Sequence, residues 1–162
     1  MYKCGLQTFA KNQPRLRQVK QIIIDELLTS GDINEAYQMS KSINDYERCL
    51  KIVTSSMDTK KIKECLESLE ISHEERVKKA REILDKIKDE AKNKSDLARL
   101  YAYVGDYEEA VSLWLKNGDY RKFYQYINKV SAEFIDSEVI PGLKLQCSLR
   151  KNLLLKDKNL YH

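Results

Sequence analysis

Catalysis by a nucleophile and a base relies most often on histidine, and this chain of 162 residues has only two. His162 is the final residue, so a Ser-His-Asp or Cys-His arrangement could be built only around His73. Two glutamates follow His73 in the first turn of an expected helix, a position typical of a solvated surface residue. No H-E-x-x-H, G-x-S-x-G or G-x-G-x-x-G motif occurs. We therefore expect a protein that is not an enzyme and that uses no cofactor.

The cysteines are scattered without a C-x-x-C pair, at Cys4, Cys49, Cys65 and Cys147. This spacing does not predict a zinc site, and we expect buried, reduced structural thiols. The opening residues, MYKCGLQTFA, lack the apolar core of a signal peptide. No run approaches the ~18 apolar residues that span a bilayer. These features predict a cytoplasmic protein without a membrane span, which could reach endomembranes only peripherally, through its partners.

Composition indicates a globular all-α protein. Hydrophobic residues make up 42% and charged residues 33%, a balance typical of a chain with a packed core. Five glycines and two prolines are few for an all-β protein, which uses turn residues freely. We therefore expect about nine to ten helices joined by short polar turns.

The net charge of +4 is unevenly distributed. Residues 1–24 carry +5 and residues 139–162 carry +4, which leaves −5 for the residues between them. A dedicated nucleic-acid domain has a continuous basic face, so binding to nucleic acid is not the favoured function. It remains the alternative, as a helical-repeat binder that uses the basic termini together with Arg121 and Lys122.

Helix-start signals divide the first half of the chain. Pro14 suits the first turn of a helix that ends near Gly31. Asp32, Asp45 and Asp58 can each cap a following helix, over residues 33–43, 46–56 and 59–69. Ser72 and Glu75 then form the S-x-x-E pattern of a capping box, which opens the longest helix, to about Asn93. Fewer than three full heptads are too few to predict an independent coiled coil, so we expect this helix to pack on its neighbours, with a dimer seam as the alternative.

The second half continues the pattern. Ser95 is expected to cap the next helix, and the stretch from Val104 to Ile127 contains Gly-Asp-Tyr twice, thirteen residues apart. Thirteen residues suit one three-turn helix and its turn. Pro141-Gly142 predicts a break before a final helix.

An internal repeat explains the doubled phrase. When the chain is offset by 74 residues, residues 31–53 align without gaps over residues 105–127. The identical pairs are Gly31/Gly105, Asp32/Asp106, Glu35/Glu109, Ala36/Ala110, Asp45/Asp119 and Tyr46/Tyr120. Self-similarity of this kind is the mark of a helical-repeat array.

The repeated residues predict the turns. Gly31 and Gly105 can take the left-handed conformation that closes a helix, and Asp32 and Asp106 can cap the next one. Asn44-Asp45 and Gly118-Asp119 are expected to play the same part in the second half of each copy. Ala36 and Ala110 are small enough for two helices to approach closely.

The sequence thus predicts one all-helical domain over residues 1–162, an α-solenoid-like array. Its parts are a first copy at 15–56, connecting helices at 57–93, a second copy at 94–130, and C-terminal helices with a basic tail at 131–162. Five expected helices separate the copies, and an odd number would reverse the chain direction between them. Either a helix has been merged or split between Met57 and Asn93, or the array bends there.

The stretch from Lys94 to Val130 resembles helical-repeat proteins of the tetratricopeptide and clathrin-heavy-chain kind. It is especially similar to arrays in vesicle coat and tethering subunits and in intraflagellar-transport subunits. The matching residues are Ala98, Leu100, Tyr101, Gly105, Asp106, Tyr107, Ala110, Leu113, Gly118, Asp119 and Tyr120. The resemblance implies a scaffold or adaptor of membrane traffic, which binds a helix or peptide in a repeat groove or neighbouring subunits of a complex.

Aromatic residues supply the candidate contacts. Eight of them lie within residues 101–126, and of these Tyr101, Tyr107, Tyr120 and Phe123 are expected in the core because the repeat keeps their apolar character. The other four, Tyr103, Trp114, Tyr124 and Tyr126, align with Thr29, Ser40, Leu50 and Ile52. Aromatic side chains at a surface are typical anchors of protein interfaces. We take these four, with Arg121 and Lys122, as candidate partner-binding residues, and for Trp114 a place in the core is an equal alternative.

Overall fold

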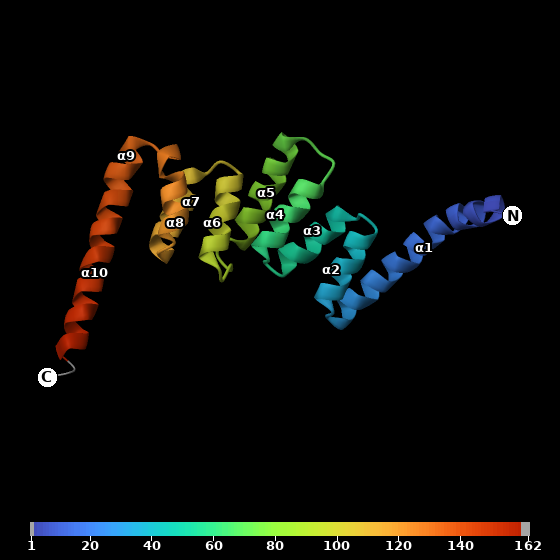
Figure 1. The fold of residues 1–162 in the computed structure, drawn as a ribbon, viewed down its shortest axis with the longest axis horizontal. Coiled ribbons are helices and arrows are strands. Elements are labelled where there is room, and N and C mark those ends of the chain that lie inside the picture. The colour runs from blue at the N-terminus through green and yellow to red at the C-terminus, as the bar shows by residue number, and fades with distance from the viewer. Residues whose placement is uncertain (1, 160–162) are drawn as a thin grey trace. The chain divides into compact units, whose positions relative to one another are not determined.

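The computed structural model describes the backbone of residues 2–159 and the side chains of residues 12–158. Every regular element in that range is helical, as Figure 1 shows, so the prediction of an all-α array is confirmed. The elements are α1 (Tyr2–Ser30), α2 (Ile33–Ser42), α3 (Tyr46–Ser55), α4 (Thr59–Ser68), α5 (His73–Ile87), α6 (Lys94–Tyr103), α7 (Tyr107–Asn117), α8 (Tyr120–Tyr126), the 3-10 helix η1 (Ile127–Lys129), α9 (Ala132–Phe134), the π-helical segment η2 (Ile135–Val139) and α10 (Ile140–Asn159).

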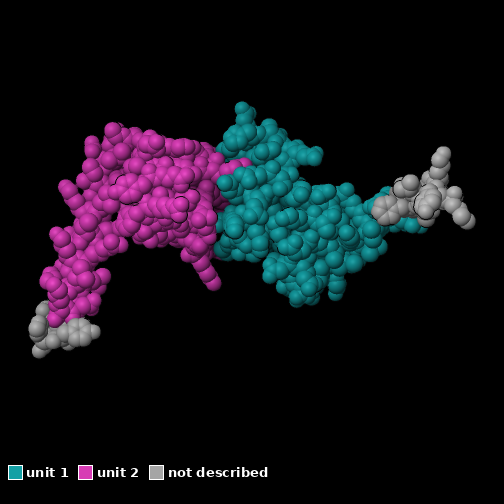
Figure 2. All heavy atoms as spheres, viewed as in Figure 1, with its two compact units in different colours: residues 1–79 teal, residues 80–162 magenta. Residues whose placement is uncertain are grey.

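The chain divides into two compact units, residues 1–79 and 80–162, which Figure 2 shows in teal and magenta. The boundary falls inside α5, within the segment predicted to connect the two copies. Within each unit, helices that follow one another along the chain pack side by side: α1 to α4 in the first, and α6 to α8 in the second. This neighbour-to-neighbour packing is the arrangement of a helical array. A single domain over residues 1–162 stays a prediction.

The turns that close the helices have the predicted backbone conformation in both copies. Gly31, Gly105 and Gly118 have φ angles of 90°, 87° and 73°. Asn44, which the repeat aligns with Gly118, has a φ of 55°. Positive φ is strained for most residues but accessible to glycine and tolerated by asparagine. The left-handed turn therefore recurs in both copies of the repeat, and it explains why glycine or asparagine occupies these four positions.

The hydrogen bonds of these turns also repeat. The backbone N–H of Asp32 donates to the carbonyl of Leu27 at 2.8 Å, and the N–H of Asp106 donates to the carbonyl of Tyr101 at 3.0 Å. Each bond reaches back five residues and satisfies a carbonyl that the end of the helix would otherwise leave without a partner. The turns of Asp45, Asp58 and Asp119 have the same bond. The shared unit is one helix and its closing turn.

The aspartates that follow the turns do not all cap in the predicted way. The carboxylates of Asp45 and Asp119 accept from the backbone N–H groups of Arg48 and Lys122, at 3.1 and 3.3 Å. Asp32 and Asp106 stand at the same position of their helices, but their side chains accept no such bond. That part of the prediction is wrong, because other donors take these two carboxylates. The hydroxyl of Ser30 donates to Asp32, and the guanidinium of Arg81 donates to Asp106, each at 3.1 Å.

Near residue 72 the capping box is confirmed, whereas the next expected cap is wrong. The N–H of Ser72 donates to the Glu75 carboxylate at 3.1 Å, and the N–H of Glu75 donates to the Ser72 hydroxyl at 3.2 Å. The helix that follows ends at Ile87, six residues before the expected end. Asn93, rather than Ser95, caps α6, because its side-chain oxygen accepts from the N–H of Asp96 at 3.2 Å.

The helix boundaries predicted from the two prolines are also wrong. The first helix runs through Pro14. Pro14 is exposed, so the backbone hydrogen bond that its missing N–H removes lies on the solvent side. Likewise the chain does not break at Pro141-Gly142, because both residues belong to the first turn of α10. The π-helical segment η2 ends immediately before them, and its wider turn accommodates a residue that cannot donate a hydrogen bond.

Each unit has its own core. In the first unit the side chains of Ile24, Ala36, Cys49, Ile62 and Leu66 are fully buried. A cluster in the second unit consists of Ala98, Ala110, Val111, Trp114, Leu115, Phe123 and Val139. Ala36 and Ala110 are both 0% exposed, as expected for small residues where helices pack closely.

Candidate protein-interaction surface

Trp114 belongs to the core of the second unit. Its side chain is 1% exposed, and its indole N–H donates to the backbone carbonyl of Ser95 at 3.2 Å. The hydroxyl of Ser95 in turn donates to the carboxylate of Asp119 at 2.9 Å. The alternative in which Trp114 anchors a partner is therefore wrong. A bulky indole at this position fills the space enclosed by α6, α7 and α8.

Tyr126 is half-buried beside that core. Its ring centroid lies 5.0 Å from that of Trp114 and 6.1 Å from that of Tyr107. The ammonium of Lys129 lies 4.9 Å from the centroid of the Tyr107 ring, close enough for a cation–π interaction. Much of this aromatic surface is thus already in contact within the unit.

The remaining candidates divide by exposure. Tyr124 is 74% exposed, and Arg121, one helical turn before it on α8, is also exposed. Lys122 is half-buried and donates to the side-chain oxygen of Gln125 at 3.4 Å. Tyr103 is half-buried on α6. Of the candidates, Arg121 and Tyr124 are therefore exposed one turn apart on α8, whereas Tyr103, Lys122 and Tyr126 are half-buried.

A row of aliphatic side chains on α1 is the most exposed apolar surface among the side chains described in the first unit. We call Leu16, Val19, Ile22 and Ile23 the α1 stripe; their exposed fractions are 49%, 51%, 63% and 40%. Ile24, on the side of α1 that faces α2, is 0% exposed. The three- and four-residue spacing of Leu16, Val19, Ile22, Ile23 and Leu27 predicts an amphipathic helix with one buried face. It did not reveal that α1 is apolar on two sides.

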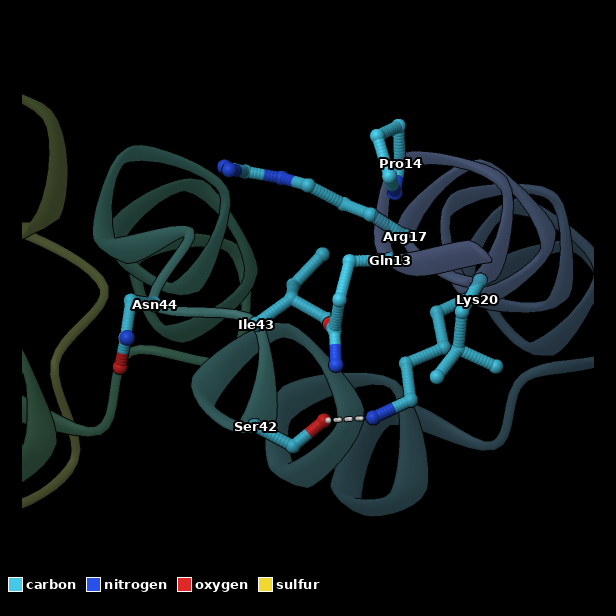
Figure 3. Close-up of a pocket in the computed structure, with 8 residues that line it drawn as sticks. Gln13, Pro14, Arg17, Lys20, Ser42, Ile43 and Asn44 are labelled. Carbon is cyan, nitrogen blue, oxygen red and sulfur yellow. Dashed lines mark hydrogen bonds between the residues drawn. The ribbon is translucent and has the colours of Figure 1, made fainter. Parts of the chain in front are cut away.

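A polar cavity of about 460 Å³ lies beside this stripe, between α1 and the turn that follows α2. Figure 3 shows Arg17 and Lys20 extending from α1 toward Ser42, Ile43 and Asn44. The ammonium of Lys20 donates to the hydroxyl of Ser42 at 3.3 Å. Basic side chains are favourable at the carboxyl end of a helix, and Arg17 and Lys20 lie beside the last residue of α2.

A second cavity, of about 290 Å³, lies in the second unit between α7 and the start of α10. It is lined mostly by apolar atoms, and Leu145 lies at its edge. Leu145, Leu149 and Leu153 are 62%, 55% and 63% exposed. The four-residue spacing of these leucines was the available signal, and the sequence-based interpretation did not use it.

Three reactive groups of the first unit are enclosed together. Tyr37, Cys49 and Cys65 are 5%, 0% and 2% exposed. Burial raises the pKa of the Cys49 thiol to about 12, and it also raises the pKa values of the Cys65 thiol and the Tyr37 hydroxyl. These are the inert thiols that the sequence predicts, but Cys147 is exposed, against that prediction. Cys4 lies outside the residues whose side chains are described.

Histidine, cysteine and acidic side chains form no cluster of three or more that could hold a metal ion within the described part of the chain. His73 is exposed, as expected. None of the described helices is long and apolar enough to cross a membrane. The chain matches no protein-family model, no curated protein and no solved structure.

Proposed function

We propose that this protein is a non-catalytic scaffold, which binds other proteins through the surface of its helical array. The observation that carries the proposal is the α1 stripe. Apolar side chains scattered singly over a surface are ordinary, but a contiguous row on one side of a helix is typical of a protein contact. A helix of a partner would cover the stripe as α2 covers the other side of α1.

The charges around the stripe indicate the chemistry of that partner. Arg15 and Arg17 are exposed on α1 next to the stripe, and Arg17 also lines the polar cavity with Lys20. An amphipathic helix with an apolar face and acidic flanks would match both features. The resemblance to coat and tethering arrays makes membrane traffic the setting in which we expect this partner.

Affinity capture with a matched pair of variants tests the proposal. Val19→Asp with Ile22→Asp places two acids in the stripe, whereas Asn34→Asp with Gln38→Asp adds the same charge at exposed polar positions of α2. Circular dichroism should show that wild type and both variants are equally helical, because all four side chains are exposed. Each retained protein is then purified and its binding to the three forms is measured directly.

We expect a partner that binds wild type and the Asn34/Gln38 variant and loses affinity for the stripe variant by about tenfold or more, as for an interface anchor. Cross-linking between that partner and α1 should accompany binding. A partner that binds all three forms equally would contradict a contact at the stripe. Proteins whose retention disappears after nuclease treatment would favour the nucleic-acid alternative.

A further inference from the structure

The second half of α10 extends away from the helices of its unit. The first half is anchored: Val139, the last residue of η2 before α10, is buried, and the side-chain amide of Gln146 donates to the carbonyl of Leu115 on α7. From Cys147 to Lys158 every side chain is exposed. Figure 1 shows this half of the helix projecting past α7 and α8, and Figure 2 shows it as a narrow arm of the magenta unit. The helix therefore has an anchored half and a free half, which meet near residue 147.

One face of this helix follows a three- and four-residue spacing. Glu138 lies near the end of η2, and Gly142 and Leu145 follow it on α10; all three line the apolar cavity beside α7. The same spacing continues through Leu149, Asn152 and Lys156, all exposed. We call these six residues the α10 seam. A repeat of 3.5 residues is the spacing with which two helices pack along their whole length.

The order of residues in the seam is symmetric about residue 147. When two copies of α10 lie antiparallel with residue 147 at the centre, Leu145 of one faces Leu149 of the other, and Gly142 faces Asn152. At each end Glu138 faces Lys156, so two ion pairs form. In a parallel pair each residue would face its own copy, and like charges would lie together.

The remaining basic residues of α10 lie away from the seam. Lys144, Lys151 and Lys158 are seven residues apart and, at about 100° of rotation per residue, fall on the far side of the helix. Arg150 is directed to the body of its unit, where its guanidinium lies 5.6 Å from the Tyr120 ring centroid. The seam is therefore apolar in the middle with one acid and one base at its ends, although the C-terminal segment as a whole is strongly basic.

From this pattern we infer that the α10 seam binds a second copy of this chain, as an antiparallel helix pair with twofold symmetry. The free half of each helix lies against the anchored half of the other, so both halves gain a partner. Leu153 of one copy flanks the seam at the level of the apolar cavity of about 290 Å³ in the other copy, which it can enter. A twofold contact of this kind uses the same surface on both copies and closes on itself.

Sedimentation equilibrium over a concentration series of the whole chain tests the inference. Wild type should dimerise, and Leu149→Glu should weaken association by about tenfold or more, because it buries a charge at the centre of the pair. Leu154→Glu is the matched control, since Leu154 is 63% exposed on the same helix but faces away from the seam. Its association should equal that of wild type.

Charge exchange tests the antiparallel order. Glu138→Lys places a base opposite Lys156, and Lys156→Glu places an acid opposite Glu138, so each variant alone should weaken the dimer. The double variant restores both ion pairs and should recover the association of wild type. Three results would each overturn the inference. The double variant could fail to recover the association of wild type, Leu149→Glu and Leu154→Glu could weaken the dimer equally, or wild type could stay monomeric at every concentration. Capture of a different protein by the seam of such a monomer would likewise replace the second copy as its occupant.

Discussion

Trp114 is hydrogen-bonded to the carbonyl of Ser95, and through this bond α7 is tied to the first turn of α6. The repeat aligns Trp114 with Ser40, which is also fully buried in the first unit. The hydroxyl of Ser40 donates back to the carbonyl of Ala36 at 2.8 Å, within its own helix. The same position of the repeat therefore holds two different side chains. In the second copy Trp114 bonds to a neighbouring helix, whereas in the first copy Ser40 bonds only within its own helix.

Trp114→Ala should destabilise the protein by about 3–5 kcal/mol, because it leaves a large cavity and removes the partner of the Ser95 carbonyl. Urea unfolding followed by circular dichroism measures this change. Tyr124→Ala is the control, because Tyr124 is 74% exposed and should lose no more than about 0.5 kcal/mol. Equal losses in the two variants would contradict the placement of Trp114 in the core.

The two kinds of aspartate at helix starts should differ in their contribution to stability. Asp45→Ala removes the acceptor for the N–H of Arg48 and should cost about 1 kcal/mol, as for other helix caps. Asp32→Ala removes only an exposed bond from Ser30, so its cost should be clearly smaller. Midpoints of urea unfolding for the two variants provide the comparison. An equal loss would show that Asp32 also caps its helix in solution.

Replacing a left-handed glycine with alanine should lower the free energy of unfolding through backbone strain alone. No atom lies within 4 Å of a Cβ added to Gly31, Gly105 or Gly118, so steric overlap with neighbours plays no part. The positive φ angle should nevertheless cost about 1–2 kcal/mol at each site. Asn44→Gly, at a φ of 55°, is the reverse change and should be neutral or stabilising. Thermal unfolding of the four variants tests the contrast, which would fail if Gly118→Ala were as stable as wild type.

The enclosed thiols predict a loss of stability at alkaline pH. Burial raises the pKa of Cys49 from 9.0 to about 12, so the folded state keeps this thiol neutral while the unfolded state ionises it. The free energy of unfolding should therefore be constant below about pH 9 and fall as the pH rises toward 12. Cys65 and Tyr37, whose pKa values are also raised, contribute in the same direction.

The matched variant for this experiment is Cys49→Ala with Cys65→Ala. It should be less stable than wild type at pH 7 because it removes buried side chains, but its stability should decline less steeply between pH 9 and pH 11. Parallel declines in the two proteins would assign the alkaline loss to other groups.

Thiol modification should separate the cysteines in the native protein. Cys147 is exposed on α10 and should react with iodoacetamide while the protein is folded. Cys49 and Cys65 should react only after unfolding, because they are enclosed and their thiolates are suppressed. Peptide mapping by mass spectrometry reports each site. Modification of Cys49 before unfolding would show that the core of the first unit opens readily.

The turns could be predicted from the sequence because their causes are local. A glycine or asparagine before an aspartate encodes both the positive φ angle and the start of the next helix within two residues. Met57 has a φ of 55° in the same kind of turn, yet its residue type carries no such signal. Its position, thirteen residues after Asn44, is what reveals it.

The parts that could not be predicted depend on surroundings. Whether an aspartate bonds to its own helix or to Arg81 depends on which donors the fold brings near it. The burial of Trp114 and the exposure of the α1 stripe depend on which side of a helix finds a neighbour. The sequence predicts a break at Pro141 because proline normally interrupts a helix. The helix continues here because a π-helical turn precedes the proline and leaves room for a residue without a backbone N–H.

The closing turns have a consequence for how such a chain can change in length. Gly31, Asn44 and Met57 follow one another at intervals of thirteen residues, and so do Gly105 and Gly118. Each turn is completed by a bond that reaches back only five residues. Duplication or deletion of a thirteen-residue segment therefore leaves every other closing turn intact. A change by two segments also preserves the direction of the chain. Such a chain can therefore lengthen by tandem duplication without requiring a new kind of turn between helices.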